Sequence, residues 1–407
     1  MIDLEFLKKQ FEKNFEYIVQ NGYYGIEPHI YAELYFTKKA TMRPTFLNKV
    51  FRKLEVKTIQ HLPFLIKPYC KVLKIDYMML TPYGLGFFLQ AFSKGYKIQK
   101  TEDYLAEIEK VANQLESLLV KTKHGLGIPN SKSSNSSVLG NIVTDANTAY
   151  VPGGTECILG YLDAFGVTHE QKYLEYSKKI ANSFFKDFKI KKYNNNRICF
   201  DYSNHEDNTH ILNANILVAL SLLEVSTRIE GTKYNEVITS SYNYTLDYIK
   251  EYDEIPYAGI EDEKINKYRK GYDCYHTGFV LRSMYKIDKK INNGRDFNLI
   301  FLKVKTMMLD FVYNEIVSMF KNKKVYDIHA FAEYIYTYSI FYDYFTIEEK
   351  SKIENIIEKS FKLFESKKDK RRYIYKKDSF FSVDEYMPLW GQSAMMNAIS
   401  NLIIKKS

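Results

Sequence analysis

The clearest pattern along the chain is an alternation of apolar, small-residue-rich stretches with amphipathic, charged stretches. Six apolar stretches begin roughly 50 to 75 residues apart, at 82–92, 154–165, 213–224, 276–287, 329–341 and 390–403. The charged stretches between them are 101–120, 169–188, 232–251, 296–319 and 346–365. A repeat of one buried and one surface helix predicts stacked α-hairpins. Six such pairs predict an all-α fold, the (α/α)6 toroid.

The N-terminal segment completes this count. From Asp3 to about Val19, apolar residues recur with helical spacing, so we expect this segment to supply the sixth outer helix. Thr101, Thr168 and Thr346 each precede acidic residues, which predicts N-caps for three outer helices.

The 407 residues show no linker that would divide them into domains. We expect one toroid domain over 1–407, with 1–75 as an N-terminal helical region packed on the barrel. Four prolines within 28–75 predict short helices there. The polar run 130–137 is expected to be an exposed loop, and the few prolines and glycines argue against an all-β fold.

Composition narrows the function classes. Lysines that we expect to be dispersed over the surface give a net charge of +9. No zinc finger, RRM or arginine-rich arm accompanies this charge, which argues against a nucleic-acid partner. Four cysteines without CxxC spacing predict free buried thiols. Without a signal-like start or a long apolar run, the sequence predicts a cytoplasmic protein with no transmembrane segment.

In a toroid of alternating hairpins, the starts of all inner helices share one end of the barrel. Four residues near these starts are the candidate catalytic groups. Asp273 is expected to cap a helix and to lie on the same face as His276, while Tyr275 lies between them. Glu156 falls inside an apolar helix, where burial would raise its pKa and suit a general acid.

Other polar and aromatic side chains near the same starts are candidates for binding substrate. His329 and Glu333 are four residues apart, which predicts a hydrogen bond that raises the imidazole pKa. Trp390, the only tryptophan, is a candidate platform for stacking a pyranose. The remaining candidates are Tyr150, Asp201, Tyr202, His210, Asn213, Asn215, Asp327 and Gln392.

Five segments resemble, in the same order, bacterial proteins encoded with exopolysaccharide and capsule genes, the VpsJ-like family. They are AYVPGGTECILGYLDAF, CFDYSNHEDNTHILNANILVALSLL, YDCYHTGFVLRSMYKI, YDIHAFAEYIYTYS and YMPLWGQSAMMNAIS. Cys274 stands where an asparagine would be expected. The resemblance implies a carbohydrate-active toroid acting in surface polysaccharide biosynthesis, similar to uronyl hydrolases and sugar epimerases.

The residues leave the reaction open. Hydrolysis would use two carboxylates such as Asp273 and Glu156, whereas epimerisation or elimination beside a uronate would use Tyr275 or His276. The expected ligand is a glycan or sugar phosphate. We expect it to be anionic because the N-termini of the inner helices converge on it. We expect neither metal nor cofactor.

Two alternative functions remain open. One is a non-catalytic glycan-binding or scaffold subunit, peripherally associated with polysaccharide-assembly proteins. The other is a zinc-dependent prenyltransferase- or cyclase-like toroid that uses Asp273, Cys274 and His329.

Overall fold

The computed structural model describes residues 2–27, 30, 34–43, 45–61, 65–129, 147–193, 196–262, 272–379 and 382–407. Six helices form a closed ring in which each contacts the next and the last contacts the first. They are α6 (Pro82–Gln99), α8 (Val151–Thr168), α10 (Leu212–Ile229), α13 (Cys274–Ile291), α15 (Ile328–Phe341) and α17 (Ser393–Lys406). The predicted (α/α)6 toroid is confirmed.

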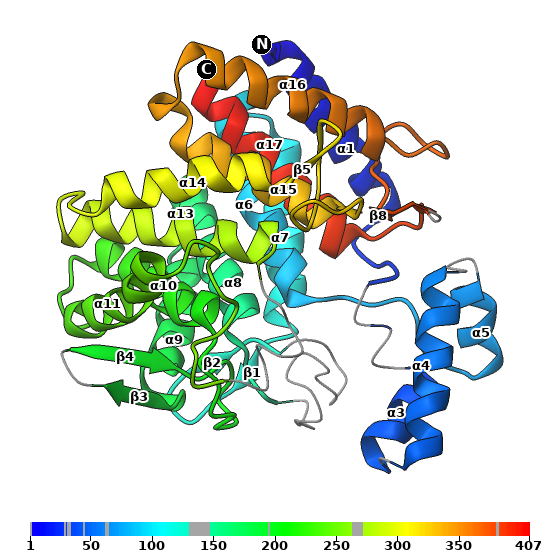
Figure 1. The fold of residues 1–407 in the computed structure, drawn as a ribbon, viewed down its shortest axis with the longest axis horizontal. Coiled ribbons are helices and arrows are strands. Elements are labelled where there is room, and N and C mark those ends of the chain that lie inside the picture. The colour runs from blue at the N-terminus through cyan, green and yellow to red at the C-terminus, as the bar shows by residue number, and fades with distance from the viewer. Residues whose placement is uncertain are drawn as a thin grey trace.

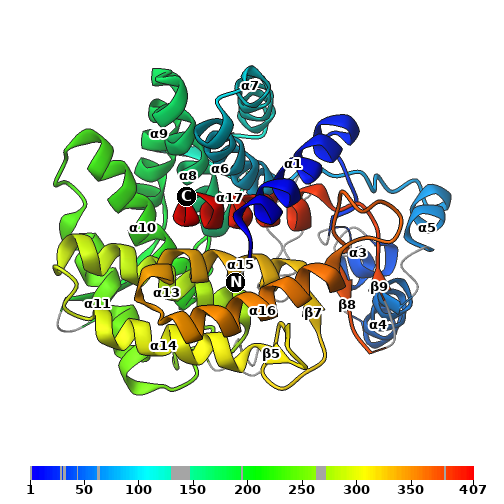
Figure 2. The same ribbon diagram turned by 90° about the horizontal axis from the view of Figure 1, so that it is seen from above.

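Outer helices surround this ring when it is seen from above (Figure 2). They are α7 (Glu102–Glu116), α9 (Gln171–Asp187), α11 (Asn235–Glu251), α14 (Phe297–Asp310), α16 (Ile347–Phe364) and α1 (Leu4–Asn21). Helix α1 packs on α17, as expected for the sixth outer member. The prediction of a helix over 296–319 was too long, because Asn314 and Glu315 adopt positive φ and turn the chain into a hairpin of β5 (Val312–Tyr313) and β6 (Ile316–Val317).

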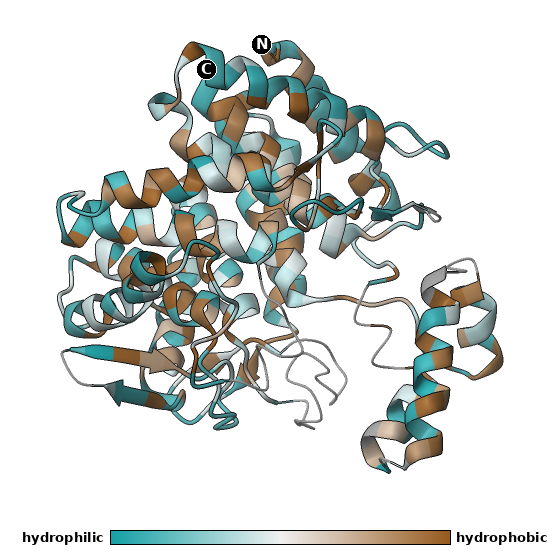
Figure 3. Cartoon of the chain, in the orientation of Figure 1, coloured by the Kyte–Doolittle hydropathy of each residue, from teal (hydrophilic) through white to brown (hydrophobic). Residues whose placement is uncertain are grey.

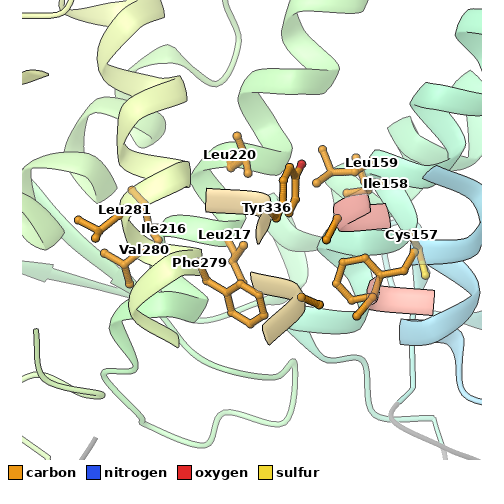
Figure 4. Packing of buried hydrophobic residues seen from close by; sticks show 14 of the residues in the cluster. Cys157, Ile158, Leu159, Ile216, Leu217, Leu220, Phe279, Val280, Leu281 and Tyr336 are labelled. Atoms are coloured by element: carbon orange, nitrogen blue, oxygen red, sulfur yellow. The ribbon is translucent and has the colours of Figure 1, made fainter. Parts of the chain in front are cut away.

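The inner helices are buried on nearly all sides because outer helices cover one face and the ring interior covers the other. Figure 4 shows side chains of the core, among them Ile158, Leu217, Leu220 and Phe279, meeting from different inner helices. Helices α6 and α8 approach closely at a glycine: a Cβ on Gly86 would lie 2.6 Å from the carbonyl carbon of Glu156. Small residues therefore set the spacing of this pair.

The three predicted threonine caps have different outcomes. Thr346 forms a complete capping box with Glu349 at the start of α16, which confirms that prediction. Thr101 occupies the N-cap position of α7 without a side-chain cap hydrogen bond. Thr168 is the last residue of α8, where its hydroxyl donates to the carbonyl of Ala164, so the prediction that it caps the next helix is wrong.

Short strands connect several hairpins. They are β1 (Val120–Lys121) with β2 (Leu126–Gly127), β3 (Ile190–Tyr193) with β4 (Arg197–Phe200), and β7 (Tyr326–Asp327) with β8 (Lys376–Lys377) and β9 (Ser382–Val383), all antiparallel. Strand β4 precedes α10 in the chain. Strand β7 runs directly into α15, so pairing with β8 fixes where that inner helix begins.

Residues 34–75 form what we call the arm: α3 (Tyr35–Met42), α4 (Phe46–His61) and α5 (Ile66–Val72). The arm stands beside the ring rather than within it (Figure 1). A small separate core joins it to the C-terminal segment, with Ile59, Ile66 and Cys70 packed near Val383 and Met387. Helices occupy the described parts of 28–75, as expected, but α4 with 16 residues is longer than the short helices predicted. The predicted loop 130–137 lies outside the described residues.

All four cysteines are buried and free, as predicted. Among the described helices, α10 alone has the length and apolar composition that a membrane span needs, and 78% of that window is buried inside the protein. Such burial is typical of a core helix in a toroid.

Candidate functional site

The starts of four inner-helix segments meet at one place in the barrel. His329 opens α15, Tyr83 opens α6, Tyr275 lies in the first turn of α13, and Trp390 lies in the π-helical turn η3 (Pro388–Gln392) before α17. The His329 ring stacks on Trp390 with centroids 4.8 Å apart. Tyr83 and Tyr275 contact the same imidazole at 5.7 Å and 5.3 Å. We call these four side chains the His329 cluster.

Hydrogen bonds fix the state of the His329 ring. Its Nδ1 lies 3.2 Å from the backbone carbonyl of Trp390, which only accepts, so Nδ1 carries the proton. Nε2 then accepts from the hydroxyl of Tyr83 at 3.0 Å. Burial lowers the pKa of His329 to about 4, so the imidazole is neutral at physiological pH. Burial, with the charges of Glu156 and Glu333, raises the pKa of Tyr83, which keeps the phenol protonated.

The predicted pairing of His329 with Glu333 is wrong, and so is the raised imidazole pKa. Glu333 turns instead to Arg282 of α13, whose Nε donates to it at 2.9 Å, and to the hydroxyl of Thr337. A buried cation forms a stronger, charge-assisted hydrogen bond with the carboxylate than a neutral imidazole would form. Without a carboxylate partner, the desolvated His329 loses basicity rather than gaining it.

Beneath the His329 cluster lies a buried charge group of Arg282, Glu156 and Glu333. Arg282 Nη2 donates to Glu156 at 3.1 Å, and Gln90 Nε2 donates to the same carboxylate at 2.8 Å. All three charged side chains are at most 3% exposed. Burial raises the pKa of Glu333 to about 7 despite the neighbouring cation. Glu156 is thus tied into the barrel wall.

Asp273 and His276 form a carboxylate–imidazole dyad at the start of α13. One carboxylate oxygen of Asp273 accepts the backbone N–H of His276 as the helix cap, which confirms the predicted cap. The other lies 2.7 Å from His276 Nδ1. Because the carboxylate accepts, Nδ1 carries the proton and Nε2 carries the lone pair. His276 is thereby oriented as a proton acceptor.

Aromatic rings connect this dyad to the His329 cluster. Tyr275 lies 4.1 Å from the ring of His276 and also contacts His329. The ring centroid of Phe279 lies 6.2 Å from that of His276 and 6.0 Å from that of His329. Tyr257 packs edge-on against His276, with centroids 4.6 Å apart. The two imidazoles therefore belong to one aromatic-lined site.

Several predicted residues lie in a neighbouring group around the loop before α10. The Asp201 carboxylate accepts from Lys191 and from the backbone of Asn208, so it organises this loop. Tyr202 packs against Tyr150 at the start of α8. His210 Nδ1 lies 3.2 Å from Asp262. The buried Asn213 shares a small hollow with Tyr257, His276 and Thr277, which links this group to the dyad.

Three predicted residues make structural contacts. Asn215 bonds to Phe200 of β4 and to Ser241 of α11, facing the outer layer. Gln392 bonds to Asn14 of α1 and to the backbone of Tyr373. The Asp327 carboxylate accepts the backbone N–H of His329 at 2.9 Å, and burial raises the pKa of Asp327 to about 6. We place Asn215 and Gln392 outside the site and Asp327 in support of His329.

Within the described residues, no group of three His, Cys, Asp or Glu side chains is arranged to hold a metal ion. For the zinc alternative, Asp273, Cys274 and His329 would have to converge. The Cys274 thiol instead donates to the carbonyl of Ala330, and both nitrogens of His329 are engaged by Tyr83 and Trp390. These residues do not fit the zinc site.

Sequence reasoning missed Tyr83 and Arg282. The sequence could have identified Arg282, because a charged residue inside an otherwise apolar inner helix requires a buried partner of opposite charge. Tyr83 lies in the first inner helix, outside the five segments that carry the family resemblance, and its role depends on which inner helix closes the ring. Tyr83 reaches Trp390 because α6 packs on both η3 and α17 where the ring closes.

Comparison with known families gives one match. The family described as the D-glucuronyl C5-epimerase C-terminus matches residues 153–294, which span α8 to α13 and include the dyad. The match covers about a third of the chain. No curated protein sequence matches it.

Solved structures share the fold along most of the chain. A cellobiose 2-epimerase from Bacillus thermoamylovorans superposes with a TM-score of 0.62 at 12% identity, covering 81% of this chain and 88% of that one. A family 76 α-mannanase from Bacteroides thetaiotaomicron gives 0.61 at 12% identity, covering 82% and 88%. A D-mannose isomerase gives 0.60 at 11% identity, covering 82% and 89%. At these identities the likeness establishes the toroid fold.

Proposed function

We propose that this protein is a carbohydrate-active enzyme that epimerises a sugar by proton transfer, most simply at the carbon beside a uronate carboxyl. The observation that carries the proposal is the pair of imidazoles with fixed proton positions in one aromatic-lined site. His276 presents Nε2 as a base, and Tyr83, hydrogen-bonded to His329, supplies a phenolic proton. The partial match to the C5-epimerase family and the fold shared with epimerases and an isomerase support this choice.

The reaction balances with these residues alone. His276 Nε2 takes the proton from the carbon, the electron pair delocalises into the adjacent carboxyl, and Tyr83 delivers a proton to the opposite face. Exchange of both groups with water restores the starting protonation, so hydrogen from solvent enters the product. The single phenolic proton of Tyr83 is donated to His329 Nε2 in the resting site, so the hydroxyl turns from Nε2 toward the carbon to deliver it.

A glycosidase reading is less well supported by the geometry. Hydrolysis by Asp273 and Glu156 requires two carboxyl groups that flank one bond. Glu156 is 1% exposed and held by Arg282 and Gln90, while Asp273 is engaged by the His276 backbone and ring. Both carboxylates therefore have positioning roles.

We further propose a cytoplasmic role in the biosynthesis of a surface polysaccharide. The support is the ordered set of segments that resemble the VpsJ-like proteins, together with the epimerase-family match over 153–294. An anionic uronate also suits a site assembled from helix N-termini.

The test is incubation with glucuronate-containing polysaccharides in heavy water, read by NMR at C5. We expect deuterium incorporation without new reducing ends, reduced by about 10²- to 10⁴-fold in His276→Gln and Tyr83→Phe. His169→Asn is the matched control, because His169 is exposed at the far end of α8 and adopts a left-handed conformation that asparagine tolerates. New reducing ends would identify a hydrolase instead. Glycan binding without either product would indicate the non-catalytic subunit.

A further inference from the structure

The arm carries the entire net charge of the protein. Residues 34–75 contain ten lysines and arginines and a single acidic residue, Glu55, so they carry +9. In the other residues the 48 basic and 48 acidic side chains cancel. The expectation of a dispersed positive charge was therefore wrong, and the basic charge is concentrated in one structural element.

Glu55 does not offset this charge at the surface. Its carboxylate is buried and accepts the backbone N–H groups of Phe36 and Thr37, both at 3.0 Å, and the hydroxyl of Tyr69. These bonds tie α3, α4 and α5 together. Lys39, Lys49, Lys53 and Lys57 are exposed on the outside.

The same arm exposes large apolar side chains. Of the 19 exposed large hydrophobic residues described in the chain, nine lie in the arm. Five of them occupy positions i, i+1, i+4, i+5 and i+8 of α4: Phe46, Leu47, Val50, Phe51 and Leu54. That spacing places them on one face of the helix. Figure 3 shows the apolar segments on these helices at the edge of the molecule.

The apolar surface continues from α4 onto α5. A groove of about 520 Å³ between them is lined mainly by apolar side chains, including Phe51, Leu54, Leu65 and Val72. Val72 itself is 80% exposed, as is Phe46. Lys49, Lys53 and Lys57 follow one another at intervals of four residues on α4, so they form a basic line beside the apolar face.

We propose that the arm binds the surface of an anionic phospholipid membrane, with the exposed apolar face of α4 and the end of α5 inserted among the lipid chains. An apolar helical face bordered by lysines is the arrangement that binds such an interface. Charge complementarity favours anionic lipid headgroups. The apolar side chains favour lipid over an acidic glycan, which would leave Phe46, Leu47 and Val72 in water. This inference does not depend on the proposed epimerase activity.

The experiment is co-sedimentation of the full-length protein with phosphatidylcholine vesicles, with and without phosphatidylglycerol. We expect binding only to the anionic vesicles, weakened by high salt. The double variant K53E/K57E should bind at least about 30-fold more weakly, because removing each lysine near an anionic surface costs about fivefold and the new glutamates add repulsion. F46S/L54S should also lose binding, while circular dichroism stays unchanged because these side chains are exposed.

Matched controls come from the barrel. K289E/K290E reverses two exposed charges on α13, and L302S/L309S removes two exposed leucines of α14, which are 60% and 77% exposed. Both controls should bind as the wild type does. Failure of the wild type to bind anionic vesicles, or equal binding by folded arm variants, would overturn the proposal. Binding of an acidic polysaccharide that K53E/K57E abolishes, without vesicle binding, would assign the arm to a glycan.

Discussion

Replacing Arg282 with methionine tests how the buried charge group stabilises the barrel. Arg282 is fully buried and donates to Glu333 at 2.9 Å and to Glu156 at 3.1 Å. Methionine fills much of the same volume without a charge. Removing the cation leaves carboxyl groups that must take up protons to remain buried.

The magnitude follows from that protonation. For a glutamate whose pKa in the unfolded chain is about 4.3, protonation costs about 3.7 kcal/mol at pH 7 and about 1.6 kcal/mol at pH 5.5. Glu333, with its pKa raised to about 7, is already partly protonated at pH 7, so Glu156 accounts for most of the new cost. We therefore expect Arg282→Met to lower the free energy of unfolding by about 3 to 4 kcal/mol at pH 7 and by about half that at pH 5.5.

The sign of the pH dependence is fixed by linkage. A carboxyl whose folded pKa lies above its unfolded pKa binds protons more tightly in the folded state, so stability falls as pH rises through that window. For Glu333 in the wild type the window runs from about 4.3 to 7. In Arg282→Met the decrease should be steeper, because a second carboxyl contributes.

The assay is urea unfolding followed by circular dichroism at both pH values. Adding Glu156→Gln and Glu333→Gln to Arg282→Met should restore most of the stability at pH 7. Arg228→Met, an exposed arginine at the end of α10, is the control and should change stability by less than about 0.5 kcal/mol. A loss below about 1 kcal/mol, or a loss of equal size at both pH values, would refute the reasoning.

Two further substitutions test the helix packing and the caps. Gly86→Ala should destabilise the protein by about 2 kcal/mol or more, because its Cβ would meet the backbone of Glu156, whereas Gly166→Ala in open space should be neutral or stabilising by up to about 1 kcal/mol; thermal melting of the pair measures the difference. Thr346→Ala should cost about 1 kcal/mol through loss of the capping box, and Thr101→Ala, without a cap bond, should cost less; equal losses in urea would contradict the assignment.

The local pattern of the sequence determined the fold. Apolar stretches with 3.6-residue periodicity can be buried only as helices covered on both sides, and six of them with six amphipathic partners close a ring. The same local information identified Asp273 as a cap, because capping depends on residues within one turn. It also identified Thr346 with Glu349.

Contacts between distant segments determined the hydrogen-bond partners of the site residues. His329 and Glu333 are neighbours on one helix, yet each bonds to a residue of another helix. Tyr83 reaches His329 only when the ring closes, and Arg282 reaches Glu333 only when α13 packs on α15. Such partners decide whether a buried carboxyl group can act as a general acid or serves only to hold neighbouring helices together. Glu156, bonded to Arg282, does the latter. The same holds for the charge of the arm. Ten basic residues lie within 34–75 of the sequence, but packing alone buries Glu55 and leaves the lysines and the apolar face of α4 exposed. Periodicity specifies which face of a helix is apolar, and tertiary structure determines what that face meets.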